Sequence, residues 1–344
     1  MPRFFVAVST AQYSESFKDP RFKPLLTRIV KRLSVPSELA GRRLDQAAAE
    51  LMPEFSRSRL RAWIDAGALL VGGREAKARM LVKGGEELAL QAELEAAVGA
   101  QAEPIPVAIV HADDALLVID KPVGLVVHPG AGNRSGTLQN ALLHRYPELA
   151  VLPRAGLVHR LDKDTSGLLL VARTLPSHTA LTAALERREI KRTYRAICQG
   201  VLTGGGTIDA PIGRHRRERT KMAVTEGGRA ARTRYRVVER FRAHTYCELE
   251  LETGRTHQIR VHMAHIRAPL LGDPVYGGRP KLPPAASDEL RAALQAFRRQ
   301  ALHASRLQLA HPITGAALAF ESPIAADFAS LLELLRADMS GARR

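Results

Sequence analysis

Residues 159–173 read HRLDKDTSGLLLVAR, a densely charged loop that runs directly into an apolar segment. The apolar part, residues 168–172, has the length of a buried strand, and Thr165, Ser166 and Gly167 before it favour a turn. Functional side chains commonly lie on loops that a rigid scaffold holds in place. This stretch therefore predicts a central strand of the fold with a candidate site at its beginning.

The segments around this strand alternate between strand and helix patterns. Short β-branched runs punctuated by Gly and Pro predict strands within 107–122, 124–132, 191–200, 232–241 and 246–254. Apolar residues at helical spacing predict helices at 136–149, capped near Thr137, and at 178–190. The predicted fold class is α+β, or mixed α/β, with a large sheet.

The composition indicates a folded protein with a polyanionic partner. At roughly 150 residues per domain, 344 residues accommodate two domains, and 45% hydrophobic residues is close to the globular average. The 51 Lys and Arg against 35 Asp and Glu give a net charge of +16. This excess favours nucleic acid over an anionic membrane surface.

Several classes of protein do not fit the sequence. The longest apolar runs are far shorter than the ~20 residues of a membrane span. Two cysteines, Cys198 and Cys247, are too few for a disulfide framework and lack the spacing of a zinc site. Residues 1–33 lack the features of a signal peptide. We therefore expect a cytoplasmic, monomeric protein without a metal or membrane partner.

The N-terminal part predicts a small basic domain. Leu44, Ala48 and Leu51 share one helix face, and Ser56 is a candidate cap for a second helix that ends at Gly67. The expected division of the chain is a poorly ordered extension at 1–34, this domain at 35–91, a linker at 92–105, a larger domain with the candidate site at 106–336 and a tail at 337–344.

Arginines crowd the beginning of the second predicted helix. Positive charge there opposes the helix dipole, unless phosphates supply the countercharge. The run RHRRERTK at 214–221 also suits phosphate contact, as does ARTRYRVVERFR at 231–242, although such runs are more often a solvated surface. The candidate RNA contacts are Arg57, Arg59, Arg61, Arg214, Arg216, Arg217 and Lys221.

The candidate chemistry centres on Asp162, between Arg160 and Lys163. Cations favour the ionised carboxylate, which makes it a poor general acid and a usable nucleophile or electrostatic anchor. On spacing alone, an ordinary loop ion pair is the simpler interpretation.

Two groups of histidines invite other interpretations. His257, His262 and His265 lack the Cys or carboxylate partners of a zinc site. His128 and His159 could supply acid–base chemistry, but structural hydrogen bonds explain them more simply.

Longer motifs show a resemblance to a known family, and this resemblance favours a catalytic Asp162 over an ordinary loop ion pair. HRLDKDTSGLLLVAR, KRTYRAICQG at 191–200 and the segment 251–278 are similar, nearly residue for residue, to the RluA-type family of RNA pseudouridine synthases. RLDQ, SRSRLRAWI, the VGG turn and GGEEL resemble an S4-type RNA-binding module. Together the matches cover most of residues 36–336 and look closest to the subgroup that modifies large-subunit ribosomal RNA in the helix 69 stem-loop.

The resemblance implies a fold, a reaction and roles for four residues. The fold would be a mainly antiparallel catalytic sheet behind an S4-like domain, and the reaction would need no cofactor. Asp162 would be the catalytic aspartate and Tyr194 the tyrosine that stacks on the flipped uracil. Arg255 would pair with Asp162, and Arg160 would help to prise out the base.

Two rival functions stay open. A non-catalytic assembly factor would use the basic surface only to bind ribosomal RNA, and a sibling synthase would act on other ribosomal or transfer RNA positions.

Overall fold

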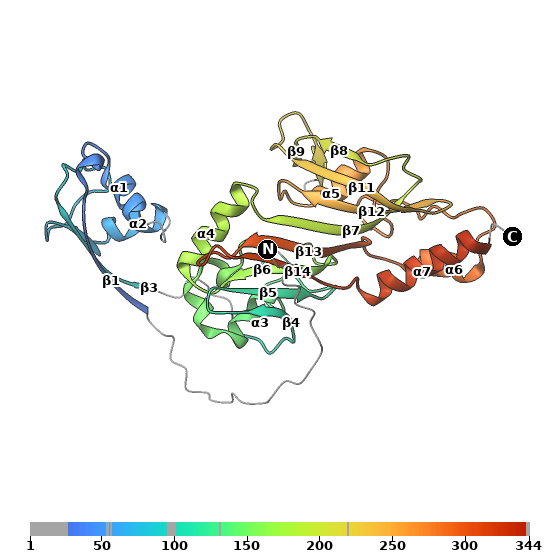
Figure 1. The fold of residues 1–344 in the computed structure, drawn as a ribbon, viewed down its shortest axis with the longest axis horizontal. Coiled ribbons are helices and arrows are strands. Elements are labelled where there is room, and N and C mark those ends of the chain that lie inside the picture. The colour runs from blue at the N-terminus through green and yellow to red at the C-terminus, as the bar shows by residue number, and fades with distance from the viewer. Residues whose placement is uncertain are drawn as a thin grey trace.

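The computed structural model describes residues 27–341, except 53–54, 56, 95–100, 131 and 219. A small N-terminal domain precedes a larger domain built on one long sheet (Figure 1). No helix in the described part of the chain is long and apolar enough to cross a bilayer. The candidate cap Ser56 lies outside the described residues, as do residues 1–26 of the predicted extension.

The small domain packs two helices against three antiparallel strands. Its elements are β1 (Thr27–Ser34), the short 3₁₀ helix η1 (Ser37–Leu39), α1 (Leu44–Leu51), α2 (Arg57–Asp65), β2 (Leu69–Val71) and β3 (Glu87–Leu94), with the strands in the order β1-β3-β2. Leu44 and Ala48 are buried on the predicted face of α1, and Leu60 and Ile64 are buried on α2.

The extension predicted at 1–34 is too long, because residues 27–34 form β1. This strand pairs along its whole length with β3, from Thr27 opposite Leu94 to Ser34 opposite Glu87. Its partner lies at the far end of the domain, so no local pattern marks the pairing.

A nine-stranded sheet forms the larger domain, in the order β4-β5-β6-β13-β7-β12-β11-β8, with β14 paired to β13. Its strands are β4 (Ala108–Ala112), β5 (Leu116–Lys121), β6 (Ser166–Ala172), β7 (Lys191–Gln199), β8 (Gly206–Asp209), β11 (Arg232–Arg240), β12 (His244–Leu251), β13 (Leu302–Ala310) and β14 (Ala317–Glu321). Among the described strands, only β6 and β13 pair in parallel. The predicted α+β class with a large, mainly antiparallel sheet is confirmed.

Helices flank this sheet and a small hairpin extends from it. The helices are α3 (Leu138–Arg145), the 3₁₀ turns η2 (Pro147–Val151) and η3 (Pro153–Gly156), α4 (Leu175–Glu186), α5 (Gln258–His265), α6 (Asp288–Ala296) and α7 (Ala326–Gly341), and the hairpin strands are β9 (Ile212–Arg214) and β10 (Met222–Val224). Thr137 caps α3 as predicted, because its hydroxyl accepts from Asn140 N while the Asn140 side chain accepts from Thr137 N at 3.0 Å.

Two further predicted boundaries shift. The linker expected at 92–105 begins inside β3, and its far end is fixed on α3, where the Glu103 carboxylate accepts from Gly136 N at 3.0 Å. The tail expected from 337 is helical instead, because α7 continues to Gly341. Asp338 in this last part forms an ion pair with Arg242 at 2.9 Å.

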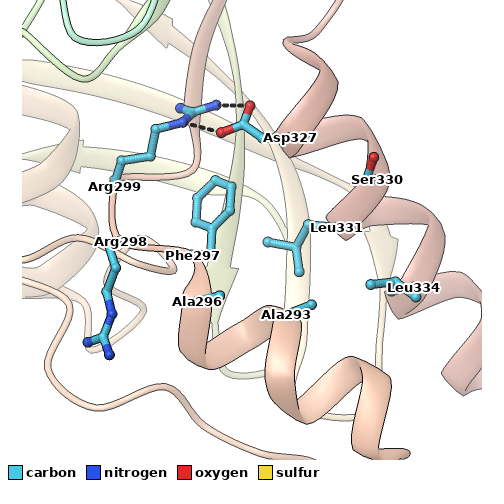
Figure 2. A pocket seen from close by; sticks show the side chains of 9 residues that line it. All are labelled: Ala293, Ala296, Phe297, Arg298, Arg299, Asp327, Ser330, Leu331 and Leu334. Atoms are coloured by element: carbon cyan, nitrogen blue, oxygen red, sulfur yellow. Dashed lines mark hydrogen bonds and ion pairs between the residues drawn. The ribbon is translucent and has the colours of Figure 1, made fainter.

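A cavity of about 470 Å³ lies between the end of α6, the 297–299 segment after it and α7 (Figure 2). Phe297 and Leu331 give it an apolar lining. The Arg299 guanidinium closes one end and binds both oxygens of Asp327 at 2.7 Å. This pair attaches α7 to a buried arginine that also reaches the loop after Asp162.

Candidate active site

The loop after Asp162 is held from one side by Lys121, a fully buried residue at the end of β5. Its ammonium group donates to three carbonyl oxygens, including that of Lys163 at 3.0 Å. Burial lowers the pKa of Lys121 to about 8, while the charges of Asp164 and Asp162 act in the opposite direction. Lys121 therefore fixes the backbone at the residue that directly follows Asp162.

The same loop is held from the other side by residues at the beginning of β13. The contacts are Arg299 Nη1 to Asp164 O (3.3 Å), Gln300 Nε2 to Thr165 Oγ1 (3.0 Å) and His303 Nδ1 to Ser166 Oγ (3.0 Å). Each loop residue from 163 to 166 is thus bound to a group from β5 or the 299–303 segment. Such support keeps a reactive side chain in one geometry.

Gly167 is the point where the parallel strands β6 and β13 touch. Its φ of +105° lies in a region that side chains rarely adopt, and a Cβ there would overlap the carbonyl oxygen of Ala304. Only glycine fits this close approach. The turn residues at 165–167 therefore place the loop against β13.

Asp162 forms an ion pair with Arg260 of α5, at 3.0 Å between Oδ2 and Nη1. Arg260 also binds Asp273 through two hydrogen bonds of 2.7 and 2.9 Å. Burial alone would lower the pKa of Arg260, but the bonds and charges of Asp273 and Asp162 outweigh it and raise that pKa. Arg260 therefore stays charged beside both carboxylates.

The pairing implied for Arg255 is not the one observed. Arg255 lies in the loop before α5 and its Nε donates to Ala230 O at 3.2 Å. α5 begins after His257, which has the left-handed φ of 56°. This turn directs the first helical turn, and with it Arg260, towards Asp162.

His257 is the second basic side chain near Asp162, at 3.9 Å between Nε2 and Oδ1. Its Nδ1 is hydrogen-bonded to the hydroxyl of Tyr276 at 2.9 Å. Burial lowers the pKa of His257, although the charge of Asp162 opposes this effect. The described residues contain no group of three or more potential metal ligands here or elsewhere.

Tyr194 on β7 is almost completely buried, with 4% of its surface exposed, and lines the same pocket as Asp162. Burial raises the pKa of its hydroxyl, while the charge of Arg192 acts in the opposite direction. Its ring, which the resemblance assigns to base stacking, thus stands beside the ion-paired carboxylate.

The pocket that contains these residues has a volume of about 540 Å³. Arg160 is exposed on its wall, and Arg255 is half-buried there. The pocket thus brings together all four predicted catalytic residues, with Asp162 and Tyr194 deeper than Arg160. Further arginines that line it are Arg154, Arg188, Arg192 and Arg229.

His159 next to this loop has the structural role that its sequence context suggested. Its Nε2 accepts from Leu170 N on β6 at 3.0 Å. Burial and the charge of Arg192 lower the pKa of His159 to about 3. The lowered pKa favours the neutral ring, and its Nε2 serves as a hydrogen-bond acceptor for the backbone of β6.

The arginines predicted on α2 differ in what they do. Arg57 donates two hydrogen bonds to the buried Asp45 carboxylate, so it is part of the fold of the small domain. Arg59 lies 5.9 Å from the centre of the Trp63 ring. Arg61 is exposed and has only a 3.7 Å ion pair with Asp65. Arg59 and Arg61 thus remain candidates for RNA contact.

The second predicted basic run forms the exposed β9–β10 hairpin. Arg214, Arg216 and Arg217 are exposed, whereas Lys221 is half-buried and paired with Glu218 at 2.6 Å. The β11 arginines behave differently, because they pair with glutamates in or directly after the adjacent β12. The pairs include Arg234 with Glu252 (2.7 Å) and Arg236 with Glu248 (2.9 Å).

Sequence reasoning missed three groups that build the site: Arg260, Lys121 and the 299–303 segment. Arg260 stands five residues after Arg255 in one basic motif, so spacing alone could not choose between them. Lys121 is the last residue of the strand β5, and nothing in the neighbouring sequence indicates that it contacts the Asp162 loop. In the 299–303 segment, RQALH, no local pattern places the chain beside the Asp162 loop.

Comparison with known proteins agrees with this geometry. Residues 115–265 match the RNA pseudouridylate synthase family, and residues 42–88 match the S4 domain. A ribosomal large subunit pseudouridine synthase D from Pseudomonas aeruginosa is 57% identical over 310 residues, covering 90% of this chain and 97% of that protein. Its namesake from Escherichia coli K12 is 52% identical, covering 90% and 96%.

Solved structures extend the similarity to the fold. Human RNA pseudouridylate synthase domain containing 4 is 28% identical and superposes with a TM-score of 0.53, covering 67% of this chain and 93% of that one. The motif around Asp162 and the strand β6 that follows it lie within the region matched to the family. The chain belongs to the RluA-type RNA pseudouridine synthases, isomerases that here carry an S4 domain ahead of the catalytic domain.

Proposed function

We propose that this protein converts uridines to pseudouridine in large-subunit ribosomal RNA, free or in a precursor particle, and that its target lies in the helix 69 stem-loop. The observation that carries the proposal is the Asp162 carboxylate, paired with the buried Arg260 beside Tyr194 in an arginine-rich pocket. The names of the relatives from P. aeruginosa and E. coli support the substrate class. The loop position rests on the family resemblance alone.

The reaction explains why these groups suffice. It breaks the N1–C1′ bond, rotates the uracil and joins C5 to C1′, so no atom is added and no redox change occurs. One ionised carboxylate beside the sugar, a cation that keeps it ionised and a ring that holds the base supply what the steps need. A metal or nucleotide cofactor has no part in this balance.

Asp162 is the residue that acts on the sugar in this proposal. Its Oδ2 is engaged by Arg260, which leaves Oδ1 directed towards His257 and the pocket. Oδ1 would either bond to C1′ or accept a proton from C2′ during glycal formation. Arg260 favours the ionised carboxylate that both routes require.

The target base must leave its stack to reach this depth. Extrusion costs a few kcal/mol and is least costly for an unpaired nucleotide in a loop. Arg160, which is exposed at the pocket wall, would occupy the vacated position, and Tyr194 would receive the base. The S4 domain and the hairpin at 212–224 would hold the surrounding RNA through its phosphates.

Pseudouridine mapping of large-subunit RNA tests this proposal. Cells that lack the protein would be complemented with wild type, with Asp162→Asn, or with Asp209→Asn as a control. Asp209 is an exposed carboxylate paired with Arg232 outside the pocket. We expect the control and wild type, but not Asp162→Asn, to restore modification in the helix 69 loop.

Two other outcomes of this mapping experiment would change either the proposed target or the proposed function. Restoration at another position would keep the chemistry and change the target. Unchanged modification in the absence of the protein, together with retained RNA binding, would indicate an assembly factor.

A further inference from the structure

Arg192 is a buried cation that the catalytic steps above do not use. It lies on β7 two residues before Tyr194, and only 8% of its surface is exposed. Residues two apart on a strand point to the same face, so Arg192 and Tyr194 stand side by side in the lining of the pocket. Arg195, on the opposite face, pairs with Glu248 at 2.9 Å.

No counter-anion accompanies Arg192 among the described residues. Its Nε is fully buried without a hydrogen-bond partner, and no described carboxylate lies within 4.0 Å of its guanidinium. Glu252, an acidic residue of the same pocket lining, pairs with Arg188, Arg232 and Arg234 instead. An unpaired buried charge is costly, so its position calls for a partner that arrives with the substrate.

The surroundings of Arg192 keep its guanidinium inside the pocket. A Cβ on Gly254 would lie 3.0 Å from Nη1, so the 253–256 loop passes directly over the guanidinium. The charge of Arg192 acts on two neighbours whose pKa values are shifted mainly by burial: it adds to the lowering for His159 and opposes the raising for Tyr194. All three side chains line the same pocket.

We propose that Arg192 donates hydrogen bonds to the carbonyl oxygens of the flipped uracil and stabilises the negative charge that this ring carries after the glycosidic bond breaks. This inference rests on the proposed function. The exposed arginines Arg154, Arg160 and Arg229 at the pocket suit backbone phosphates, which remain partly solvated. Arg192 is buried next to the base-holding ring, so its ligand is the base.

The charge arises from the balance of electrons in the reaction. When N1–C1′ breaks, the electron pair leaves on the uracil and is shared by N1 and the two carbonyl oxygens. C1′ is compensated by a bond to Asp162 or by transfer of the C2′ proton to Asp162. When C5 then bonds to C1′ with a ring electron pair, either the C1′–O bond to Asp162 breaks and its electron pair returns to the carboxylate, or Asp162 returns its proton to C2′. C5 then loses its proton and N1 gains one, so Asp162 is again a carboxylate. Arg192 would act during the interval in which the ring is anionic.

Single-turnover kinetics with excess enzyme test the role of Arg192. The substrate is ribosomal RNA from cells that lack the protein, and the variants are Arg192→Met, Arg192→Lys and the same-strand control Arg195→Met. Loss of one donor to a developing anion typically costs ~10²–10³ in rate. We expect such a loss for Arg192→Met, an intermediate rate for Arg192→Lys, a wild-type rate for the control, and RNA affinity close to wild type throughout.

Two further readouts separate a catalytic role from a structural one. Because the cation is unpaired, Arg192→Met should melt at the same temperature as wild type or higher. Guanidinium salts should restore part of the activity of Arg192→Ala, since that variant leaves a space of the same shape.

Three results would overturn the inference. A wild-type rate for Arg192→Met would remove the role altogether. Weakened RNA binding with an unchanged rate at saturating enzyme, and a salt slope flatter by ~0.7, would make Arg192 a phosphate contact. A lowered melting temperature without rescue by guanidinium would make it structural. Failure of the proposed function would be distinguishable from these results, because the wild-type enzyme itself would then form no pseudouridine.

Discussion

Replacing Arg260 by Gln separates the observed ion pair from the one that the motif suggested. The substitution leaves Asp273, whose side chain is fully buried, with only the N–H groups of Val275 and Tyr276 as donors. Removing one partner of a buried ion pair costs about 3–5 kcal/mol. At about 2–4 °C per kcal/mol for a domain of this size, the melting temperature should fall by roughly 6–20 °C.

Scanning calorimetry of Arg260→Gln and of its control Arg255→Gln measures this difference. Arg255 makes one 3.2 Å hydrogen bond to a carbonyl oxygen from a half-buried position, so its loss should cost about 1 kcal/mol or less. Turnover should be abolished by Arg260→Gln, because Asp162 then has no cation within ion-pairing distance except a protonated His257.

A double variant distinguishes the two consequences of losing Arg260. Arg260→Gln combined with Asp273→Asn removes both buried charges and leaves two amides that can hydrogen-bond each other, so much of the lost stability should return. Turnover should not return, since Asp162 is still without its guanidinium. A melting temperature of Arg260→Gln equal to wild type, or a larger fall for Arg255→Gln, would contradict this account of the site.

Three further perturbations follow from the structure. Burial lowers the pKa of His244 from 6.5 to about 4, so the unfolded chain binds more protons than the folded one between these pH values. The free energy of unfolding should therefore fall by about 3 kcal/mol as the pH drops through this window. Urea unfolding of His244→Phe should show a shallower decline. Gly167→Ala should destabilise the fold and abolish turnover, because its Cβ meets Ala304 O; a normal melting curve with full activity would count against the close approach of β6 and β13. Substituting the exposed Arg61 with Gln should weaken RNA binding and flatten its dependence on salt without altering the melting temperature; unchanged affinity in filter binding would remove this part of α2 from the RNA interface.

The sequence predicted correctly those helices and strands that a short stretch of neighbouring residues determines. The apolar run of β6, the capping residue Thr137 and the period of α1 are such signals, and each element lies where the sequence placed it. β1 was missed because it alternates weakly and its partner β3 follows two helices later. The end of α7 was missed because its last turn is held by the distant Arg242.

The candidate site was predictable only where the motif itself carries the chemistry. Asp162 and Tyr194 were chosen by resemblance, and the structure brings them to one pocket. The choice between Arg255 and Arg260 depended on the left-handed turn at His257, which no propensity of histidine predicts. Arg192 could not be singled out from sequence, because its distinguishing property is the absence of a carboxylate among its described neighbours.

The net charge of +16 shows why composition indicates a partner but not a binding surface. The arginines of β11 look in sequence like the strongest phosphate-binding run, yet they pair with Glu248 of the adjacent β12 and with Glu252, the residue that follows β12. Around the pocket, Arg160 and Arg192 have no carboxylate within ion-pairing distance among the described residues. The positive potential is therefore concentrated where acidic neighbours are missing, and the pairing of strands, more than the count of basic residues, determines where an RNA anion would bind.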